Sequence, residues 1–406
     1  MQNFSQTVQH IRSSEIRELM KLANNPDIIS FAGGMPNNNM FPVKEVDEIM
    51  KIMDPEEKKI AFQYGPTPGY PPLLKTLKEY LRKKNLPVDT HSLMITTGSS
   101  QAINILGMEF IDPGDVVLTE NPSFIGGIAV FKAFQANIIG IPLQNDGIDL
   151  EALEKVLKKH KPKILYVIPN FHNPAGIIYS KEKRQKLLKI LEGKGIVLLE
   201  DDAYNELYFD EIGKELTAPI MSMDYKDIDI VYTGSFSKIL GPGFRLGWML
   251  APPKIYEKAQ IIKQSIDACS PNFTQVIAND FIKKGYLEQY LNVIRAEYAS
   301  REKKMQTALK KYMPKEIKWT EPKGGFYFWL HLPETIDSTN VLKRSTQNGA
   351  VFVTGKTFDP YAKNNNNLRL AYSNMEEDEI EKGIKIIANA IAKELEAVHK
   401  QNTNSY

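Results

Sequence analysis

The chain has a single cysteine, Cys269, among its 406 residues. One thiol excludes an intramolecular disulfide and a metal site built from cysteines, and we predict no metal. It also fits a reducing compartment, so we expect a cytoplasmic protein.

No apolar run approaches the roughly 18–20 residues of a membrane span, and the first residues lack the continuous apolar core of a signal peptide. We therefore expect no membrane partner.

An excess of charge of one sign is also missing. The 51 basic residues are interspersed with 49 acidic ones, and the formal net charge is +2. This balance predicts no binding of nucleic acid. No G-x-G-x-x-G follows an early strand, which disfavours a nicotinamide-binding dehydrogenase.

What the chain does have, from about residue 90, is a regular alternation of apolar runs and amphipathic stretches. The apolar runs are 93–98, 116–120, 137–143, 164–169, 195–200, 229–234 and 245–252. Most are continuously apolar, which is typical of strands buried on both faces of a parallel sheet. The last follows its predecessor after only about ten residues, too few for a parallel crossover, so we expect it to be antiparallel. The pattern predicts an α/β fold with a mixed, mostly parallel, seven-stranded sheet.

The last hundred or so residues have another pattern, typical of a smaller α+β domain. A long helix is expected over 287–313, strands over 324–332, 350–355 and 367–373, and a final helix from about 376. Residues 1–45 are rich in Gly, Asn and Pro, and we expect them to pack against this domain. The predicted division is therefore 1–45 for the N-terminal segment of the small domain, 46–285 for the large domain, and 286–406 for the connecting helix and the rest of the small domain.

Polar and aromatic side chains follow the ends of several predicted strands, where ligands bind in open α/β sheets. Ser99 and Ser100 begin a helix, so they suit a phosphate site, although Ser99 alone is as well explained as an N-cap. Phe124 suits either a core position or a flat aromatic platform. Asn173 precedes a proline and is, taken singly, a turn residue.

The next two strands end in charged groups. The run 195–200 leads into Asp201, Asp202 and Tyr204, and two carboxylates there are costly unless they meet a cation or a proton donor. The run 229–234 leads into Ser235, Ser237, Lys238 and Arg245. A phosphorylated aromatic aldehyde would use all these groups together. Lysine forms a Schiff base with an aldehyde, an aspartate keeps a pyridine nitrogen protonated, and arginine with hydroxyls holds a phosphate.

Several segments carry a resemblance to one family. SFSKILGPGFRLGW, HNPAG, EDDAY and TGSSQA resemble the signatures of the fold-type I pyridoxal-phosphate aminotransferases. IISFAGGMPNNNMFP and FQYGPTPGYPPL are most similar to the kynurenine/2-aminoadipate aminotransferase subgroup. Aminotransferase-like domains of some bacterial transcription regulators are also similar, but we expect no room here for the DNA-binding domain that precedes them.

The resemblance implies roles for the residues around the cofactor, pyridoxal 5′-phosphate. Lys238 matches the Schiff-base lysine, and Asp201 matches the acid paired with the ring nitrogen. Tyr204 and Asn173 match the pair that bonds the cofactor's phenolic oxygen. Phe124 stands at the ring-stacking position, where similar proteins carry tyrosine. The phosphate site matches Ser99, Ser100, Ser235, Ser237 and Arg245.

The resemblance also implies contacts to the substrate and to a second subunit. Arg369 matches the arginine that grips the substrate α-carboxylate. Gly34 and Arg17 fall where an N-terminal segment covers the substrate. Tyr64 matches a tyrosine that reaches the phosphate of the neighbouring subunit, which implies a homodimer with shared active sites.

The resemblance thus implies an aminotransferase that exchanges the amino group between an L-amino acid and a 2-oxo acid such as 2-oxoglutarate. Donors of the 2-aminoadipate, kynurenine, aromatic and broad aliphatic kinds are all compatible with the sequence. A pyridoxal-phosphate lyase of the same fold and a non-enzymatic effector-binding module are the alternatives.

Overall fold

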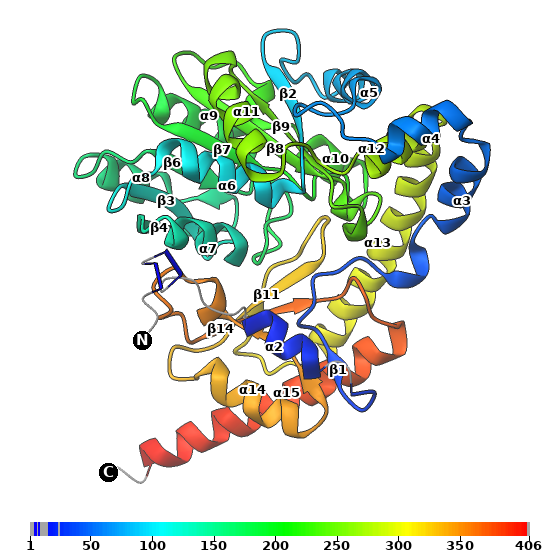
Figure 1. Cartoon of the computed structure of the whole chain (residues 1–406). Helices are drawn as coiled ribbons and strands as arrows, with labels where there is room; N and C mark the ends of the chain where they lie inside the picture. Colours follow the sequence, from blue (N-terminus) through cyan, green and yellow to red (C-terminus); the bar gives the residue numbers. More distant parts are fainter. Residues whose placement is uncertain (1–3, 6, 9–14, 23–24, 404–406) are drawn as a thin grey trace.

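A large sheet covered by helices forms one half of the molecule, and a smaller sheet with its own helices forms the other (Figure 1). The computed structural model describes residues 4–5, 7–8, 15–22 and 25–403. One long helix, α13 (Tyr286–Tyr312), runs along the side of the molecule and joins the two halves. The predicted combination of an α/β half and an α+β half is confirmed.

The large sheet has eight strands in the order β2-β9-β8-β7-β6-β3-β4-β5. Their bounds are β2 Ser92–Thr96, β3 Val116–Asn121, β4 Asn137–Gln144, β5 Gly147–Ile148, β6 Ile164–Val167, β7 Val197–Asp201, β8 Asp229–Ser235 and β9 Gly247–Ala251. The prediction of seven strands was wrong by one. The extra strand, β5, is only two residues long and pairs antiparallel with the end of β4 after a tight turn, so its sequence carries no apolar run of strand length.

The last strand of the sheet runs against its neighbours, as predicted. β9 pairs antiparallel with both β8 and β2, whereas β8, β7, β6, β3 and β4 pair in parallel. The short η3 and η4 turns, Phe236–Lys238 and Pro242–Phe244, are all that connects β8 to β9. A connection of this length cannot cross the sheet, so the chain has to return in the opposite direction.

Helices cover both faces of this sheet. Because successive strand residues point to opposite faces, Val117 belongs to the core cluster that contains residues of α6, α7 and α11. Leu118 belongs to the cluster that contains residues of α5, α8, α9 and α12. The bounds are α5 Pro71–Arg82, α6 Ser99–Phe110, α7 Ile125–Ala133, α8 Leu150–Leu157, α9 Lys181–Leu191, α10 Glu211–Glu215, η2 Ile220–Ser222, α11 Pro253–Asp267 and α12 Asn272–Lys283. Asp149 is the N-cap of α8, and its side chain accepts from the Ala152 amide.

The smaller half is built on a four-stranded antiparallel sheet in the order β10-β11-β14-β13. Its elements are β10 Lys318–Trp319, β11 Tyr327–His331, α14 Ser338–Gln347, β12 Ala350–Val351, β13 Val353–Thr354, η5 Gly355–Phe358, β14 Asn367–Ala371 and α15 Glu377–Thr403. The strand expected over 350–355 is divided between β12 and β13, which belong to different sheets.

The N-terminal part of the chain contacts both halves. β1 (Ile29–Ser30) pairs in parallel with β12, and α2 (Glu15–Leu22) lies beside the small sheet in Figure 1. After η1 (Asn38–Met40), the helices α3 (Val43–Ile52) and α4 (Pro55–Phe62) lie against α12.

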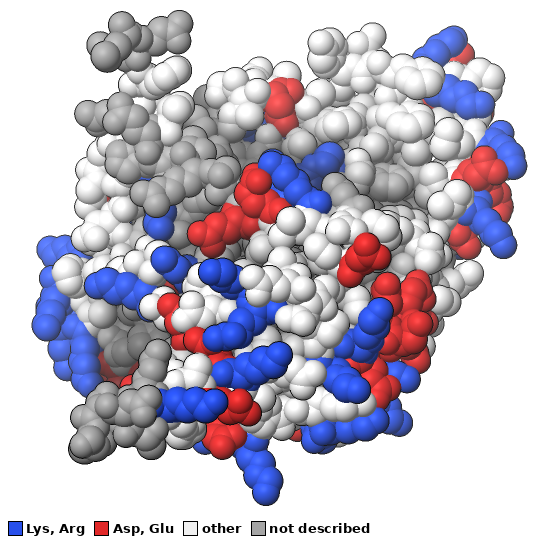
Figure 2. Space-filling view, turned by 90° about the horizontal axis from the view of Figure 1, so that it is seen from below, with Lys and Arg blue, Asp and Glu red and all other residues white. Residues whose placement is uncertain are grey.

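The surface carries both charges. In the view of Figure 2, basic and acidic side chains lie next to one another over most of the face. None of the helices described here is long and apolar enough to cross a membrane. Within the same part of the chain, no cluster of His, Cys, Asp and Glu has the makings of a metal site.

Arg184, on α9, fixes the loops at the carboxyl edge of the sheet. Its guanidinium is 1% exposed and donates to the backbone oxygens of Tyr179, Ala218, Pro169 and Leu216 and to the side chain of Asn170. One buried side chain therefore supplies donors to loops that are far apart in the sequence.

We expect Arg184→Met to lower the free energy of unfolding by about 2–4 kcal/mol, because several buried oxygens lose their donors. Denaturant unfolding measures this value. The matched control is Arg82→Met, which removes an exposed arginine paired with Asp89 and should cost less than about 1 kcal/mol. Equal losses in the two variants would contradict the argument.

Candidate functional site

The carboxyl edge of the large sheet brings the predicted site residues to one cavity. Ser99 follows β2, Asn173 follows β6, Asp201 ends β7 and Lys238 follows β8. Arg245 reaches the same edge because β9 is antiparallel and therefore begins where the parallel strands end. The cavity has a volume of about 350 Å³ and is lined by Ile16, Arg17, Met20, Gly34, Met35, Ser99, Ser100, Phe124, Ile168, Asn173, Asp201, Ala203, Tyr204, Ser235, Ser237, Lys238, Pro242, Arg245, Tyr327 and Arg369.

Lys238 lies in this cavity with its amine withdrawn from bulk water. Its Nζ donates to the Gly34 carbonyl oxygen at 2.9 Å and lies 5.5 Å from the centre of the Tyr204 ring. Burial, followed by the charges of Arg369 and Arg245, lowers the pKa of Lys238 to about 8. A lysine with this pKa is partly neutral near pH 7, and the neutral amine is the nucleophilic form.

Asp201 is the acid that faces the cavity. Its Oδ2 accepts from the Tyr166 hydroxyl at 2.8 Å, whereas its Oδ1 is buried and has no hydrogen-bond partner among the described residues. Burial raises the pKa of Asp201 to about 7. Asp202 points elsewhere, because it accepts from Asn170, Asn205 and Tyr232. The free oxygen of Asp201 is therefore available to a cationic N–H donor.

The start of α6 and Arg245 form an anion cradle. Gly98, not Ser99, is the N-cap of α6, and Ser99 makes no capping bond, so its hydroxyl is available to a ligand. Gly98 has a φ of +80°, which favours glycine, and a Cβ there would lie 2.9 Å from Nη2 of Arg245. The positive end of the helix and a guanidinium thus meet at one place, which suits a phosphate. The hydroxyl residues Ser100, Ser235 and Ser237 line the same cavity.

Arg369, on β14, is a buried cation without an acidic partner. Its Nη1 donates to Oδ1 of Asn173 at 2.8 Å and its Nη2 to the Ala32 carbonyl at 2.6 Å, while Nε has no partner. No ion pair joins it to any of the described carboxylates. A buried guanidinium held only by neutral oxygens is a site for a carboxylate.

The structure places the other predicted residues in different ways. Phe124, Gly34 and Arg17 line the cavity, as does Tyr204, whose hydroxyl lies 2.9 Å from that of Tyr327. Tyr64 is not part of the cavity of its own chain, and it is 84% exposed.

Two tyrosines near the cavity were not predicted from the sequence. Tyr327 lies in the aromatic run FYFWL and Tyr166 lies inside the apolar run ILYVIP, so both looked like core residues. A buried phenol needs a hydrogen-bond partner, and this requirement is the one feature of the sequence that could have indicated a role for them. Tyr166 contacts Asp201 and Tyr327 contacts Tyr204.

The chemistry of these groups fits pyridoxal phosphate. The cavity offers an amine with a lowered pKa, a carboxylate oxygen that lacks a donor, and a cationic cradle that accommodates a phosphate. The fold and the site together define an enzyme of the pyridoxal-phosphate class.

Comparison with known proteins gives the family. The family model described as aminotransferase class I and II matches residues 27–387. Aromatic-amino-acid aminotransferase 1 of Thermococcus litoralis is 37% identical over 398 residues, which cover 97% of this chain and 94% of that one. The kynurenine aminotransferase of Pyrococcus horikoshii, solved in complex with PMP, has a TM-score of 0.92 and 38% identity, covering 97% of each chain. The α-aminoadipate aminotransferase of Thermus thermophilus, complexed with N-(5′-phosphopyridoxyl)-L-leucine, has a TM-score of 0.85 and 34% identity, covering 97% of this chain and 98% of that one.

The chain belongs to the aminotransferase class I and II family. It is an enzyme that transfers amino groups with pyridoxal 5′-phosphate. The lyase and effector-module alternatives are not favoured, because these relatives are named as aminotransferases.

The lowered pKa of Lys238 has a consequence for stability. The folded protein holds this proton less tightly than the unfolded chain, so burial of the ammonium costs free energy at every pH below about 8. This cost declines as the pH rises from about 8 to the ordinary lysine value of 10.5, where both states are neutral.

We therefore expect Lys238→Met to stabilise the cofactor-free protein at pH 7 by about 1–3 kcal/mol, and the gain should disappear toward pH 10.5. Denaturant unfolding between pH 7 and 10 measures the difference. The control is Lys263→Met, because buried Lys263 donates to Gln101, Asp267 and Ser270, and its loss should destabilise. A Lys238→Met protein less stable than wild type at pH 7 would contradict the argument that the buried ammonium of Lys238 destabilises the folded protein.

Proposed function

We propose that this cavity is the site where the amino group passes between an L-amino acid and a 2-oxo acid, with Lys238 as the central residue. The observation that carries the proposal is a buried amine with a lowered pKa beside an unpartnered carboxylate oxygen and a cationic cradle. When bound, pyridoxal phosphate supplies an electron sink for the bonds of the substrate Cα.

Lys238 would hold the cofactor through its aldehyde, and its Nζ would move the α-proton of the substrate. The lowered pKa supports both roles, because each needs the neutral amine. Asp201 keeps the ring nitrogen of the cofactor protonated, which its free Oδ1 supports. Tyr204 and Asn173 bond the phenolic oxygen.

The remaining residues of the cavity hold the two anionic groups. Arg369 binds the substrate α-carboxylate, and its lack of an acidic partner supports this role. Gly34 and Arg17 cover the substrate, and Phe124 stacks on the ring. The phosphate is held by Ser99, Ser100, Ser235, Ser237 and Arg245.

Aromatic, kynurenine and 2-aminoadipate donors are the proposed amino donors, with 2-oxoglutarate as an acceptor. The names of the relatives from Thermococcus, Pyrococcus and Thermus support these three classes. Within the cavity, the apolar side chains of Ile16 and Met20 suit an aromatic donor, while Arg17 on the same helix suits an acidic one.

The test is a transamination assay over these donors with Lys238→Ala as the control. We expect turnover by the wild type and a loss of at least about 10³-fold in Lys238→Ala, because the attaching and proton-moving group is removed. Borohydride reduction of the holoenzyme, followed by peptide mapping, should leave the cofactor on Lys238. Recovery of the adduct on another lysine, or release of ammonia and pyruvate without an added oxo acid, would contradict the proposal.

We also propose that the enzyme is a cytoplasmic homodimer whose two active sites are shared. Tyr64 is exposed and is not among the residues that line the cavity of its own chain, so a role at a cofactor phosphate requires the site of a second copy. The neighbouring helices α3 and α4 also carry large exposed apolar side chains, among them Val43 at 69% and Phe62 at 79%. The Phe62 ring stacks on Phe273 at 5.8 Å.

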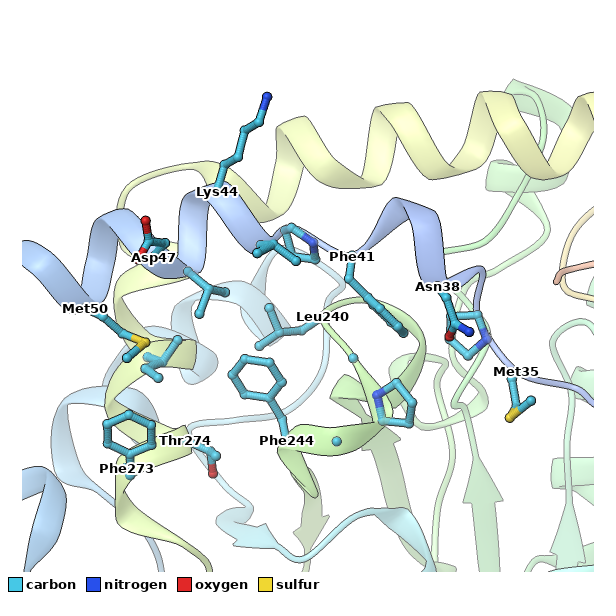
Figure 3. Close-up of a pocket in the computed structure, with 18 residues that line it drawn as sticks. Met35, Asn38, Phe41, Lys44, Asp47, Met50, Leu240, Phe244, Phe273 and Thr274 are labelled. Carbon is cyan, nitrogen blue, oxygen red and sulfur yellow. The ribbon is translucent and has the colours of Figure 1, made fainter.

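An apolar cavity continues this face. It has a volume of about 700 Å³ and lies between η1, α3, the η4 turn and α12. Phe41, Leu240 and Phe244 converge in its centre, while Lys44 points away (Figure 3). Apolar surface of this extent, next to the turn that leads to Arg245, supports a second copy of the chain as its occupant.

A hybrid dimer tests this sharing. Lys238→Ala and Tyr64→Ala homodimers should each lose most activity at limiting cofactor. When the two variants are co-expressed, each hybrid dimer contains one complete site, and roughly a quarter of wild-type activity should return. Recovery of no activity from hybrids identified by native mass spectrometry, or a monomer by light scattering, would overturn the proposal.

The proposed domain division is 46–285 for the cofactor-binding large domain, with 1–45 and 286–406 forming a small domain that closes over the substrate. The pairing of β1 with β12 supports the grouping of the N-terminal segment with the C-terminal part. Arg369, on β14, would then move with the small domain when it closes.

A further inference from the structure

Two buried phenols share a hydrogen bond inside the cavity. The hydroxyl oxygens of Tyr204 and Tyr327 lie 2.9 Å apart, and the two residues are 6% and 1% exposed. Tyr204 follows β7 in the large sheet, whereas Tyr327 begins β11 in the small one. The bond therefore joins the cofactor side of the cavity to the half of the molecule that carries Arg369.

The direction of this bond follows from the number of protons. A phenol has one O–H donor and accepts through its lone pairs. Burial raises the pKa of Tyr204 well above its usual range, so this phenol keeps its proton. If Tyr204 donates that proton to the cofactor's phenolic oxygen, it has none left for Tyr327. Tyr327 must then be the donor in the bond between the two hydroxyls.

The Tyr327 hydroxyl is held in place from the other side by Gly34. A Cβ on Gly34 would lie 1.9 Å from the Tyr327 oxygen, so this position has room only for glycine. The Arg369 guanidinium lies 4.4 Å from the centre of the Tyr327 ring. Burial raises the pKa of Tyr327, and the charge of Arg369 offsets part of this rise, so the phenol keeps its proton for donation. The hydroxyl is thus confined between the Gly34 backbone and Tyr204.

We propose that Tyr327 is a positioning residue that donates to the Tyr204 oxygen and thereby strengthens the bond from Tyr204 to the cofactor's phenolic oxygen. Hydrogen bonds in a chain polarise one another, so a donor to Tyr204 makes Tyr204 the stronger donor. The stronger bond stabilises negative charge on the phenolic oxygen. This charge then holds less tightly the proton on the neighbouring nitrogen, which links Lys238 to the cofactor. That nitrogen loses its proton at a lower pH than it would without Tyr327.

This inference rests on the proposed function, and the pH titration of the holoenzyme spectrum tests it. In the wild type, the absorption of the bound cofactor should change with pH in a single transition, whose midpoint is the quantity measured. Tyr327→Phe should raise this midpoint by roughly 0.3–1 pH unit, the equivalent of one hydrogen bond acting at a distance. Tyr204→Phe should raise it further. Because Tyr327 acts only through Tyr204, the double variant should match Tyr204→Phe alone.

Tyr372→Phe is the matched control. Tyr372 is also fully buried, but its hydroxyl donates to the Gly325 carbonyl at 2.8 Å and does not line the cavity, so the midpoint should stay at the wild-type value. An unchanged midpoint in Tyr327→Phe would overturn the inference, as would an additive shift in the double variant. A raised KM for the amino donor with no spectral shift would overturn it too, because Tyr327 would then act on the substrate directly. Wild-type protein that binds no cofactor would instead refute the proposed function.

Discussion

The cavity concentrates positive charge that the protein itself does not neutralise. Among the described residues that line it, the cations Lys238, Arg245, Arg369 and Arg17 stand beside one acid, Asp201. Arg17 and Arg245 are exposed, whereas Arg369 and the amine of Lys238 are buried, and a buried cation without a counter-ion costs free energy. For Lys238 this cost appears as a lowered pKa. The arrangement becomes favourable when anions enter. A phosphate at the start of α6 and a carboxylate at Arg369 are the anions that an aminotransferase brings to its site.

The topology of the large sheet explains how these groups meet. Parallel strands place the residues that follow them at one edge, which accounts for Ser99, Asn173, Asp201 and Lys238. Arg245 would lie at the opposite edge if β9 were parallel. The antiparallel return through the η3 and η4 turns, which ends with Arg245 in the left-handed conformation, brings the Arg245 guanidinium close to Gly98. A short connection of restricted geometry thus completes the anion cradle.

The sequence was sufficient to predict those residues of the site that directly follow the end of a strand. It predicted the strands that surround the cavity and the side chains after them, because continuous apolar runs and the polar groups that close them are local patterns. It did not predict β5, which is two residues long, or the roles of Tyr166 and Tyr327. Both tyrosines stand inside apolar runs, and their hydroxyls acquire partners only through contacts across 35 and 123 residues of chain. A pattern in the sequence carries no record of contacts at that distance.

Two backbone carbonyls of the N-terminal segment accept hydrogen bonds from the cations to which we assign the cofactor and the substrate. The Gly34 carbonyl accepts from Lys238 and the Ala32 carbonyl accepts from Arg369, so one extended stretch satisfies two cations at once. A carbonyl is a weaker partner for a cation than a carboxylate is, because the carboxylate adds the attraction of a full opposite charge. In the proposed function, a substrate carboxylate would replace the Ala32 carbonyl at Arg369, and a bond from Lys238 to the cofactor would release the Gly34 carbonyl. The segment proposed to cover the substrate is thus also the segment whose own bonds would change when the cofactor and substrate bind.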